Sequence, residues 1–211
     1  MPTRLFWLVD GCGVKQGDRV GIAMRNSPSW IALYMGILMA GGVATLLNGW
    51  WQTAELAGAI HDVDCHMVFA DAPRAQRLDE ATGLGAEVMA IDDRLPLAEA
   101  LAPLFARGGS ATTMLPMLRG DDNATILFTS GSTGQSKGAL SDHRAVMQAV
   151  FNYLVTALMM LGISSEDGKP VTTQHATLLN VPLFHVTAEV PVFLQSFAMG
   201  RKLVLMPKWD A

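Results

Sequence analysis

Charged residues and cysteines are both scarce in this sequence. Only 16% of the 211 residues are charged, and the formal net charge is -4. No basic run with interleaved aromatic residues occurs, so nucleic-acid binding has little support. The two cysteines, Cys12 and Cys65, form no CxxC pair, and no second cluster is present to complete a zinc site. This cysteine usage is typical of reduced thiols in a cytosolic protein.

The beginning of the chain lacks the features of a secretory leader. The stretch from Met1 to Asp10 lacks the charged start, the apolar run and the small-residue cleavage site of a signal peptide. Phe6–Val9, followed by Gly11, resembles the tail of a helix, so we expect further sequence upstream. Half of the residues are hydrophobic, which allows a sizeable core and disfavours disorder.

One uncharged stretch, from Trp30 to Leu47, raises the question of a membrane span. It is about 18 residues long, which is near the lower limit for a spanning helix. Gly41-Gly42 interrupts it, and a helix that ends at a glycine turn before a strand over Val43–Leu47 explains the same residues. We therefore predict a buried helix–turn–strand. A small membrane protein built on this stretch and Ala145–Ile163 remains as an alternative.

Short apolar strands alternate with helices in the first half of the chain. The predicted strands are Val20–Met24, Val43–Leu47, Met67–Ala70 and Glu87–Ile91, and the predicted helices are Pro28–Ala40 and Thr53–Ala59, the latter capped by Thr53. This order predicts an α/β fold with mostly parallel sheets flanked by helices. Residues 92–121 read as a surface connection with a short helix near Leu97–Phe105. We therefore divide the chain into a first subdomain, 1–115, and the start of a second, 116–211.

The most informative segment follows the apolar strand Ala124–Thr129. Glycines, hydroxyl groups and one lysine are concentrated at Thr129, Ser130, Gly131, Ser132, Thr133, Gly134, Gln135, Ser136, Lys137 and Gly138. Glycines let backbone amides approach an anion, while hydroxyls and a lysine add donors and positive charge. After a strand, this composition predicts a polyphosphate cradle, with a flexible surface loop as the alternative. A Walker P-loop is disfavoured because Ser136 and Gly138 occupy two of its defining positions.

A long apolar segment follows the loop. Arg144–Met160 reads as a helix that is apolar on most sides, so we expect it to be buried between layers, with His143 as its cap. The histidines outside the motifs show no metal-ligand spacing, and no metal site is predicted from His61, His66, His143 and His175. Trp50-Trp51 is expected to pack beneath the loop rather than form a ligand platform.

The segment TSGSTGQSKG resembles the signature loop of the adenylate-forming superfamily, usually written TSGSTGxPKG, with Ser136 in place of proline. Nearly the whole chain shares this resemblance. The matching segments are Gly17–Val20 with Asn26-Ser27-Pro28 at the family's first sheet, Leu47-Asn48-Gly49 at its "LNP" segment, Pro182-Leu183-Phe184-His185 at its "PLFH" motif, and Leu203–Ala211 at a strand and turn of fatty-acyl members. Gly49 departs from the family's proline.

The resemblance implies a reaction in two steps. A carboxylate attacks the α-phosphate of ATP-Mg²⁺ to give an acyl-adenylate and pyrophosphate, and a thiol, usually coenzyme A, then displaces AMP. By resemblance, the phosphates would be held by Thr129, Ser130, Ser132, Thr133 and Lys137, and the loop's curvature would be set by Gly131, Gly134 and Gly138. His185 would lie at the acyl pocket near the reacting carboxylate. Taken alone, His185 also reads as a helix-start or core histidine with one hydrogen bond.

Several family segments have no counterpart in these 211 residues. We find no "YGxTE" glutamate for magnesium, no "TGD" aspartate for the ribose, and no small C-terminal domain with its adenylation lysine. We therefore interpret the chain as an N-terminal fragment of a cytoplasmic fatty acyl-CoA synthetase that is inactive alone. Aromatic acids and amino acids remain open as substrates, and peripheral membrane contact is compatible with this interpretation. The alternative function is a non-catalytic nucleotide- or acyl-binding remnant.

Overall fold

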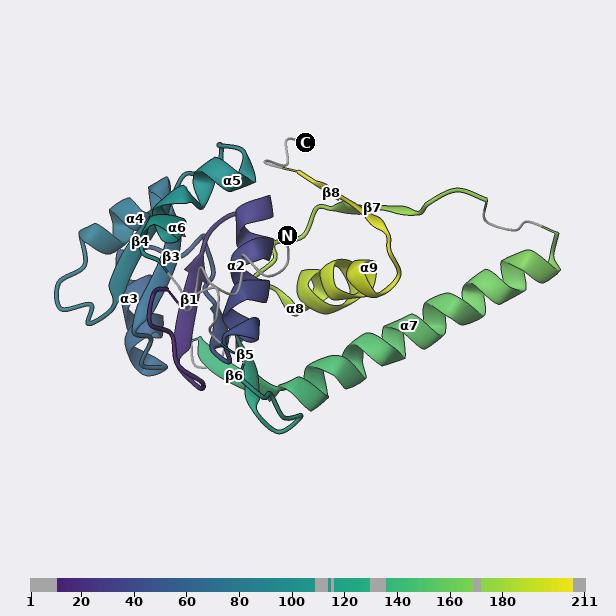
Figure 1. The fold of residues 1–211 in the computed structure, drawn as a ribbon, viewed down its shortest axis with the longest axis horizontal. Helices are drawn as coiled ribbons and strands as arrows, with labels where there is room; N and C mark the ends of the chain where they lie inside the picture. Colours follow the sequence, from purple (N-terminus) through teal and green to yellow (C-terminus); the bar gives the residue numbers. More distant parts are fainter. Residues whose placement is uncertain (1–10, 109–113, 115, 130–135, 169–171, 207–211) are drawn as a thin grey trace.

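The computed structural model describes residues 11–108, 114, 116–129, 136–168 and 172–206. Its centre is a six-stranded sheet with the order β4-β3-β1-β2-β5-β6 (Figure 1). In chain order the strands are β1 (Arg19–Ala23), β2 (Val43–Leu46), β3 (Met67–Asp71), β4 (Glu87–Ile91), β5 (Asn123–Thr129) and β6 (Lys137–Asp142). β1 to β5 pair in parallel, and β6 pairs antiparallel with β5. The predicted α/β class with a mostly parallel sheet is confirmed.

The central strands β1, β2 and β3 are buried on both faces, as expected for parallel strands with helices on either side. The helices of this part are α2 (Pro28–Met39), α3 (Thr53–Asp62), α4 (Ala72–Asp79), α5 (Leu97–Ala100) and α6 (Ala102–Ala106). Val20 and Ile22 point into a core with α2, α5 and α6, while Ala23 belongs to a second core with α3 and α4. The two cores follow from the two-residue period of a strand, which sends neighbouring side chains to opposite faces.

Local sequence explains where α2 and α3 begin. Ser27 Oγ accepts a hydrogen bond from the Trp30 amide at 3.1 Å, and Pro28 occupies the start of α2, where its missing N–H is no loss. Thr53 was predicted to cap α3, which is wrong, because the N-cap is Gln52, whose amide donates to Glu55 at 2.9 Å. The predicted helix–turn–strand over Trp30–Leu47 is confirmed.

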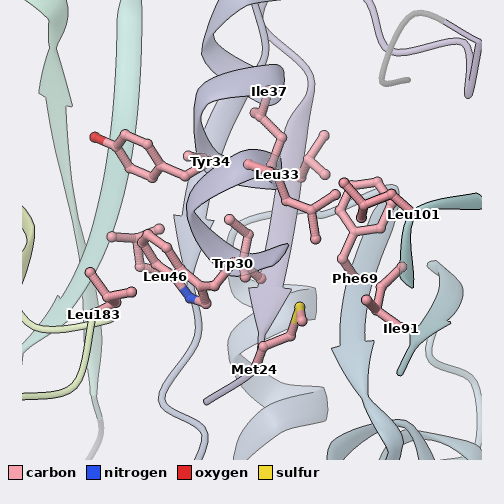
Figure 2. Close-up of a cluster of buried hydrophobic side chains, with 14 of the residues drawn as sticks. Met24, Trp30, Leu33, Tyr34, Ile37, Leu46, Phe69, Ile91, Leu101 and Leu183 are labelled. Carbon is pink, nitrogen blue, oxygen red and sulfur yellow. The ribbon is translucent and has the colours of Figure 1, made fainter. Parts of the chain in front are cut away.

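A third layer covers the outer side of α2. It contains a two-stranded parallel sheet, β7 (Ala176–Leu179) and β8 (Lys202–Leu205), with α8 (Val186–Ala188), the π-helical turn η1 (Glu189–Leu194) and α9 (Gln195–Ala198) between them. Trp30 stacks on Tyr34 with ring centroids 5.4 Å apart, and Phe193 packs its edge against both rings. The core therefore runs continuously from the large sheet through α2 into the third layer (Figure 2).

The expected subdomain boundary at residue 115 does not follow the sheets. β5 and β6 lie beyond that boundary, yet β5 pairs with β2 in the large sheet. The separate small sheet begins only at Ala176. β5 and β2 are far apart in the sequence, so the pattern of each strand alone does not predict that they pair.

The expectation that the helix after the loop is buried is wrong. α7 (His143–Glu166) extends away from the rest of the fold (Figure 1), and Val150 is its single buried residue. Asp142, rather than His143, caps it by accepting from the Ala145 amide at 2.7 Å. Among the described residues, α7 is the helix that is long and apolar enough to cross a membrane. Core helices of soluble proteins can have the same length and composition.

Candidate functional site

A cavity of about 530 Å³ opens where the carboxyl ends of β2 and β5 meet the turn before α8. Its lining consists of Leu46, Asn48, Leu127, Phe128, Thr129, Ala139, Phe184, His185 and Val186. The last residue of β5, Thr129, and the motif histidine, His185, thus share one cavity. Ligands of open α/β sheets bind outside the carboxyl ends of the strands, so the position itself favours a binding site.

The predicted phosphate loop is anchored at both ends beside this cavity. Thr129 ends β5 and Lys137 begins β6, and the two residues are cross-strand partners. Thr129 Oγ1 lies 3.5 Å from the Lys137 carbonyl oxygen, and both residues are exposed. Five predicted phosphate-binding or loop residues lie outside the described residues: Ser130, Gly131, Ser132, Thr133 and Gly134. The residues that flank the predicted loop are therefore neighbours in the sheet.

Gly138 has a different role from the predicted one. It lies within β6 opposite Phe128, and its backbone is not left-handed, so it does not set the curvature of the loop. A Cβ atom there would lie 3.0 Å from Cγ2 of Ile126 and 3.1 Å from Cγ1 of Val63. The glycine is explained by this close approach of β6 to its neighbours.

His185 combines the two interpretations that the sequence left open. It is the N-cap of α8, and its Nδ1 accepts a hydrogen bond from the Thr187 amide at 3.2 Å. It is also exposed and lines the cavity. Because Nδ1 acts as an acceptor, the neutral ring carries its proton on Nε2, which is then a donor. A donor at this rim suits a carboxylate or phosphate oxygen.

Arginines of α4 hold the loop that follows β2. Arg74 Nε donates to the Gly49 carbonyl at 2.8 Å, and Arg77 donates to the Trp51 carbonyl at 2.8 Å. Arg74 is itself paired at 2.9 Å with the buried carboxylate of Asp71. A Cβ atom at Gly49 would lie 3.1 Å from Arg74 Nε, so the arginine occupies the space of a larger residue.

The two tryptophans of this loop occupy different positions. Trp51 packs its ring against Phe128 of β5 at 5.2 Å, and it lines a smaller cavity of about 270 Å³ together with Ser136. Trp50 is 66% exposed and contacts the edge of Phe184 at 5.3 Å. The predicted packing role therefore describes Trp51, while Trp50 lies at the surface beside the PLFH turn.

Sequence reasoning missed one ionisable group next to the site. Burial raises the pKa of the Glu189 carboxyl from 4.5 to about 7, and the hydrogen bond from Tyr34 opposes this shift. The Tyr34 hydroxyl donates to Glu189 Oε1 at 2.7 Å, and burial raises the pKa of Tyr34 well above its ordinary value. The sequence feature that could have indicated this buried carboxyl is a single acidic residue within the apolar run VTAEVPVF.

Comparison with known proteins agrees with this arrangement. The AMP-binding enzyme family matches residues 7–211. The chain belongs to the AMP-binding enzyme family. Among curated members, it is 29% identical over its full length to the long-chain-fatty-acid–CoA ligase FadD13 of Mycobacterium tuberculosis and 26% identical over 97% of its length to the crotonobetaine/carnitine–CoA ligase of Proteus mirabilis. It spans 39% of the length of each of these relatives.

A solved structure of the family shares the fold. The N-terminal domain of FACL13 from Mycobacterium tuberculosis, crystallised with an inhibitor, superposes with a TM-score of 0.75 at 26% identity. The match covers 99% of this chain and 49% of that domain. The six-stranded sheet, α2 and the third layer thus form part of the N-terminal domain of an adenylate-forming enzyme.

Proposed function

We propose that this chain contributes the phosphate loop and part of the acyl site to an ATP-dependent acid–thiol ligase. The observation that carries the proposal is that Thr129 and His185 line one cavity at the carboxyl ends of β2 and β5. This shared lining supports the proposal that a nucleotide at the end of the phosphate loop meets a carboxylate beside the PLFH histidine. Family membership supports the same chemistry.

The family resemblance implies two displacement reactions at this cavity. A carboxylate oxygen attacks the α-phosphorus of ATP, and the bond to pyrophosphate breaks to leave an acyl-adenylate. The thiolate of coenzyme A then attacks the acyl carbon, and AMP departs. Donors around the phosphates stabilise the charge that develops on them, a role for Thr129, Lys137 and the residues between them. His185, with its proton on Nε2, donates to the substrate's carboxylate.

Magnesium enters this scheme with the nucleotide. The lining of the cavity contains no acidic side chain, and the described residues contain no group of three His, Cys, Asp or Glu positioned to hold a metal. We expect the main protein ligand of Mg²⁺ to be the glutamate of a YGxTE-type segment, which is not among these 211 residues, with further oxygen ligands from the phosphates and water.

A fatty acid is the proposed substrate. Leu46, Leu127, Phe184 and Val186 make much of the cavity apolar, which suits an alkyl chain. The name of the relative FadD13 supports this choice. The name of the relative from Proteus mirabilis shows that the family also serves a polar acid, so substrate class must be tested directly. We place the protein in the cytoplasm, with coenzyme A as the acceptor.

The first experiment measures binding of ATP-Mg²⁺ to the 211-residue chain by isothermal titration calorimetry. Lys137→Ala should weaken binding roughly 10- to 100-fold, because a charge-assisted hydrogen bond contributes about 1.5–3 kcal/mol. Lys202→Ala, which removes an exposed lysine from β8, is the matched control and should bind like the unmodified chain. Equal affinities for all three proteins would refute the assignment of the loop.

A second experiment separates the enzyme from a non-catalytic remnant. We expect the 211 residues alone to bind ATP weakly and to show no ATP–pyrophosphate exchange with fatty acids, because the segments that resemble the family's ribose and magnesium motifs are not among them. Clear exchange by the chain would overturn this expectation. His185→Ala should weaken binding of a non-hydrolysable acyl-adenylate and leave ATP binding unchanged. This result would support the acyl role of the histidine.

A further inference from the structure

Asn26 connects the start of α2 to the PLFH turn. Its Nδ2 donates to the Val181 carbonyl at 2.9 Å, and its Oδ1 accepts from the Leu183 amide at 2.8 Å. These bonds lie on either side of Pro182 and join residues 155 and 157 positions apart. An asparagine amide supplies a donor and an acceptor on one short side chain, which this pair of contacts requires.

The contact fixes the turn that carries His185. The His185 amide donates to the Pro182 carbonyl at 3.0 Å, so the ring leaves the backbone one turn after the segment held by Asn26. Leu183 is 1% exposed and belongs to the core that also contains Trp30 and Leu46 (Figure 2). The backbone within four residues of the histidine is thus held by hydrogen bonds from Asn26, just before α2, and by apolar packing.

A second contact holds the other side of the histidine. Tyr34, on α2, donates to the buried Glu189 carboxylate at 2.7 Å. The Glu189 amide in turn donates to the His185 carbonyl at 3.0 Å. The span from Leu183 to Glu189 is therefore attached to α2 at both ends, with the cavity-lining histidine between the attachments.

We infer that Asn26 is a positioning residue for His185. Asn26 is not part of the cavity lining, and its effect on a ligand passes through the turn that it holds. With the turn fixed, α8 keeps its N-cap, Nδ1 of His185 stays bonded to the Thr187 amide, and the Nε2 proton remains available at the cavity. The inference deepens the proposed function, since it names what orients the histidine of the acyl site.

The test records the tautomer of His185 by long-range ¹H–¹⁵N NMR on the 211-residue chain, at a pH where imidazoles are neutral. Loss of one signal in His185→Gln identifies the ring among the five histidines. The unmodified chain should show a single Nε2–H tautomer. Asn26→Ala should lose this signature and show a ring that exchanges between tautomers. Asn26→Asp keeps the acceptor for Leu183 but not the donor for Val181, so a partial loss is expected.

The control lies at the adjacent position. Ser27→Ala removes the N-cap of α2, a change that costs about 1 kcal/mol, but leaves the contacts of Asn26 in place. Its His185 signal should match the unmodified chain. An unchanged tautomer in Asn26→Ala and Asn26→Asp, or an equal change in Ser27→Ala, would overturn the inference. The readout needs no ligand, so a chain whose ATP affinity is unchanged by Lys137→Ala yet shows the Asn26 effect would refute the proposed phosphate loop and leave the positioning role intact.

Discussion

The buried carboxyl group of Glu189 should make the stability of the protein depend on pH. Glu189 is 1% exposed, and burial raises its pKa from 4.5 to about 7. The folded state therefore holds the proton more tightly than the unfolded chain. The stability that this tighter proton binding gives the folded state is fully present below the unfolded pKa of 4.5 and is lost as the pH rises through 7. Protonated Glu189 thus favours the folded protein, and ionised Glu189 opposes it.

The magnitude follows from the size of the shift. Each pKa unit corresponds to about 1.4 kcal/mol, so the move from 4.5 to about 7 amounts to roughly 3 kcal/mol for the fully ionised group. Domains of this kind are stable by only about 5–15 kcal/mol, so the loss is a large fraction of the total. Glu189→Gln removes the charge and keeps a side-chain oxygen that accepts from Tyr34. We expect the stability of this variant relative to the unmodified chain to rise by about 3 kcal/mol between about pH 4.5 and pH 8.

Urea unfolding followed by tryptophan fluorescence measures this difference, because Trp30 stacks directly on Tyr34. Glu166→Gln, at the exposed end of α7, is the charge-matched control and should show no such trend. Tyr34→Phe removes the bond that lowers the Glu189 pKa, so the pH dependence should move to higher pH. If Glu189→Gln followed the same pH profile as the unmodified chain, the buried carboxyl would not be the source of the effect.

Two further substitutions test packing and exposure. Gly138→Ala should lower the free energy of unfolding by about 1 kcal/mol, because the new methyl group crowds the side chains of Ile126 and Val63. Gly58→Ala on α3, with open space around it, should raise the free energy of unfolding by up to about 1 kcal/mol. Urea unfolding compares the two variants, and equal effects would contradict the crowding at Gly138. We expect the exposed apolar surface of α7 to cause self-association, which light scattering measures. Phe151→Glu on α7 should reduce this self-association, and the control Ser165→Glu should not. A monodisperse, unmodified monomer would refute this expectation.

Local patterns were sufficient to predict most of the strands and helices. Apolar runs bounded by turn residues marked β1 to β5, and Ser27-Pro28 marked the start of α2, because these signals act within a few residues of one another. The phosphate loop and the PLFH histidine were also recognised as motifs. The shared cavity of Thr129 and His185 depends on β5 pairing with β2 and on the third layer packing against α2, which local patterns do not show.

Long-range contacts account for the misreading of Gly138 and the omission of Glu189. Gly138 reads as a loop glycine, but its reason is Val63 at the end of α3. Glu189 reads as an isolated charge until Tyr34, 155 positions earlier, is placed beside it. α7 has the composition of a buried helix, and composition alone does not state which neighbours are present to cover it. For Gly138 and Glu189 the decisive partner is distant in sequence, where period and propensity carry no information.

The loop around Gly49, where this chain lacks the family's proline, shows how rigidity is supplied by other means. A proline restricts its own backbone dihedral, so its loss at Gly49 gives the chain more freedom in the unfolded and folded states. Arg74 and Arg77 donate to carbonyls on either side of Trp50, and Asp71 holds Arg74 in place from the end of β3. Hydrogen bonds from α4 thus restrain this loop from outside. A Cβ atom at Gly49 would crowd the Arg74 guanidinium, which would have to shift, so the glycine and the arginine are expected to change together.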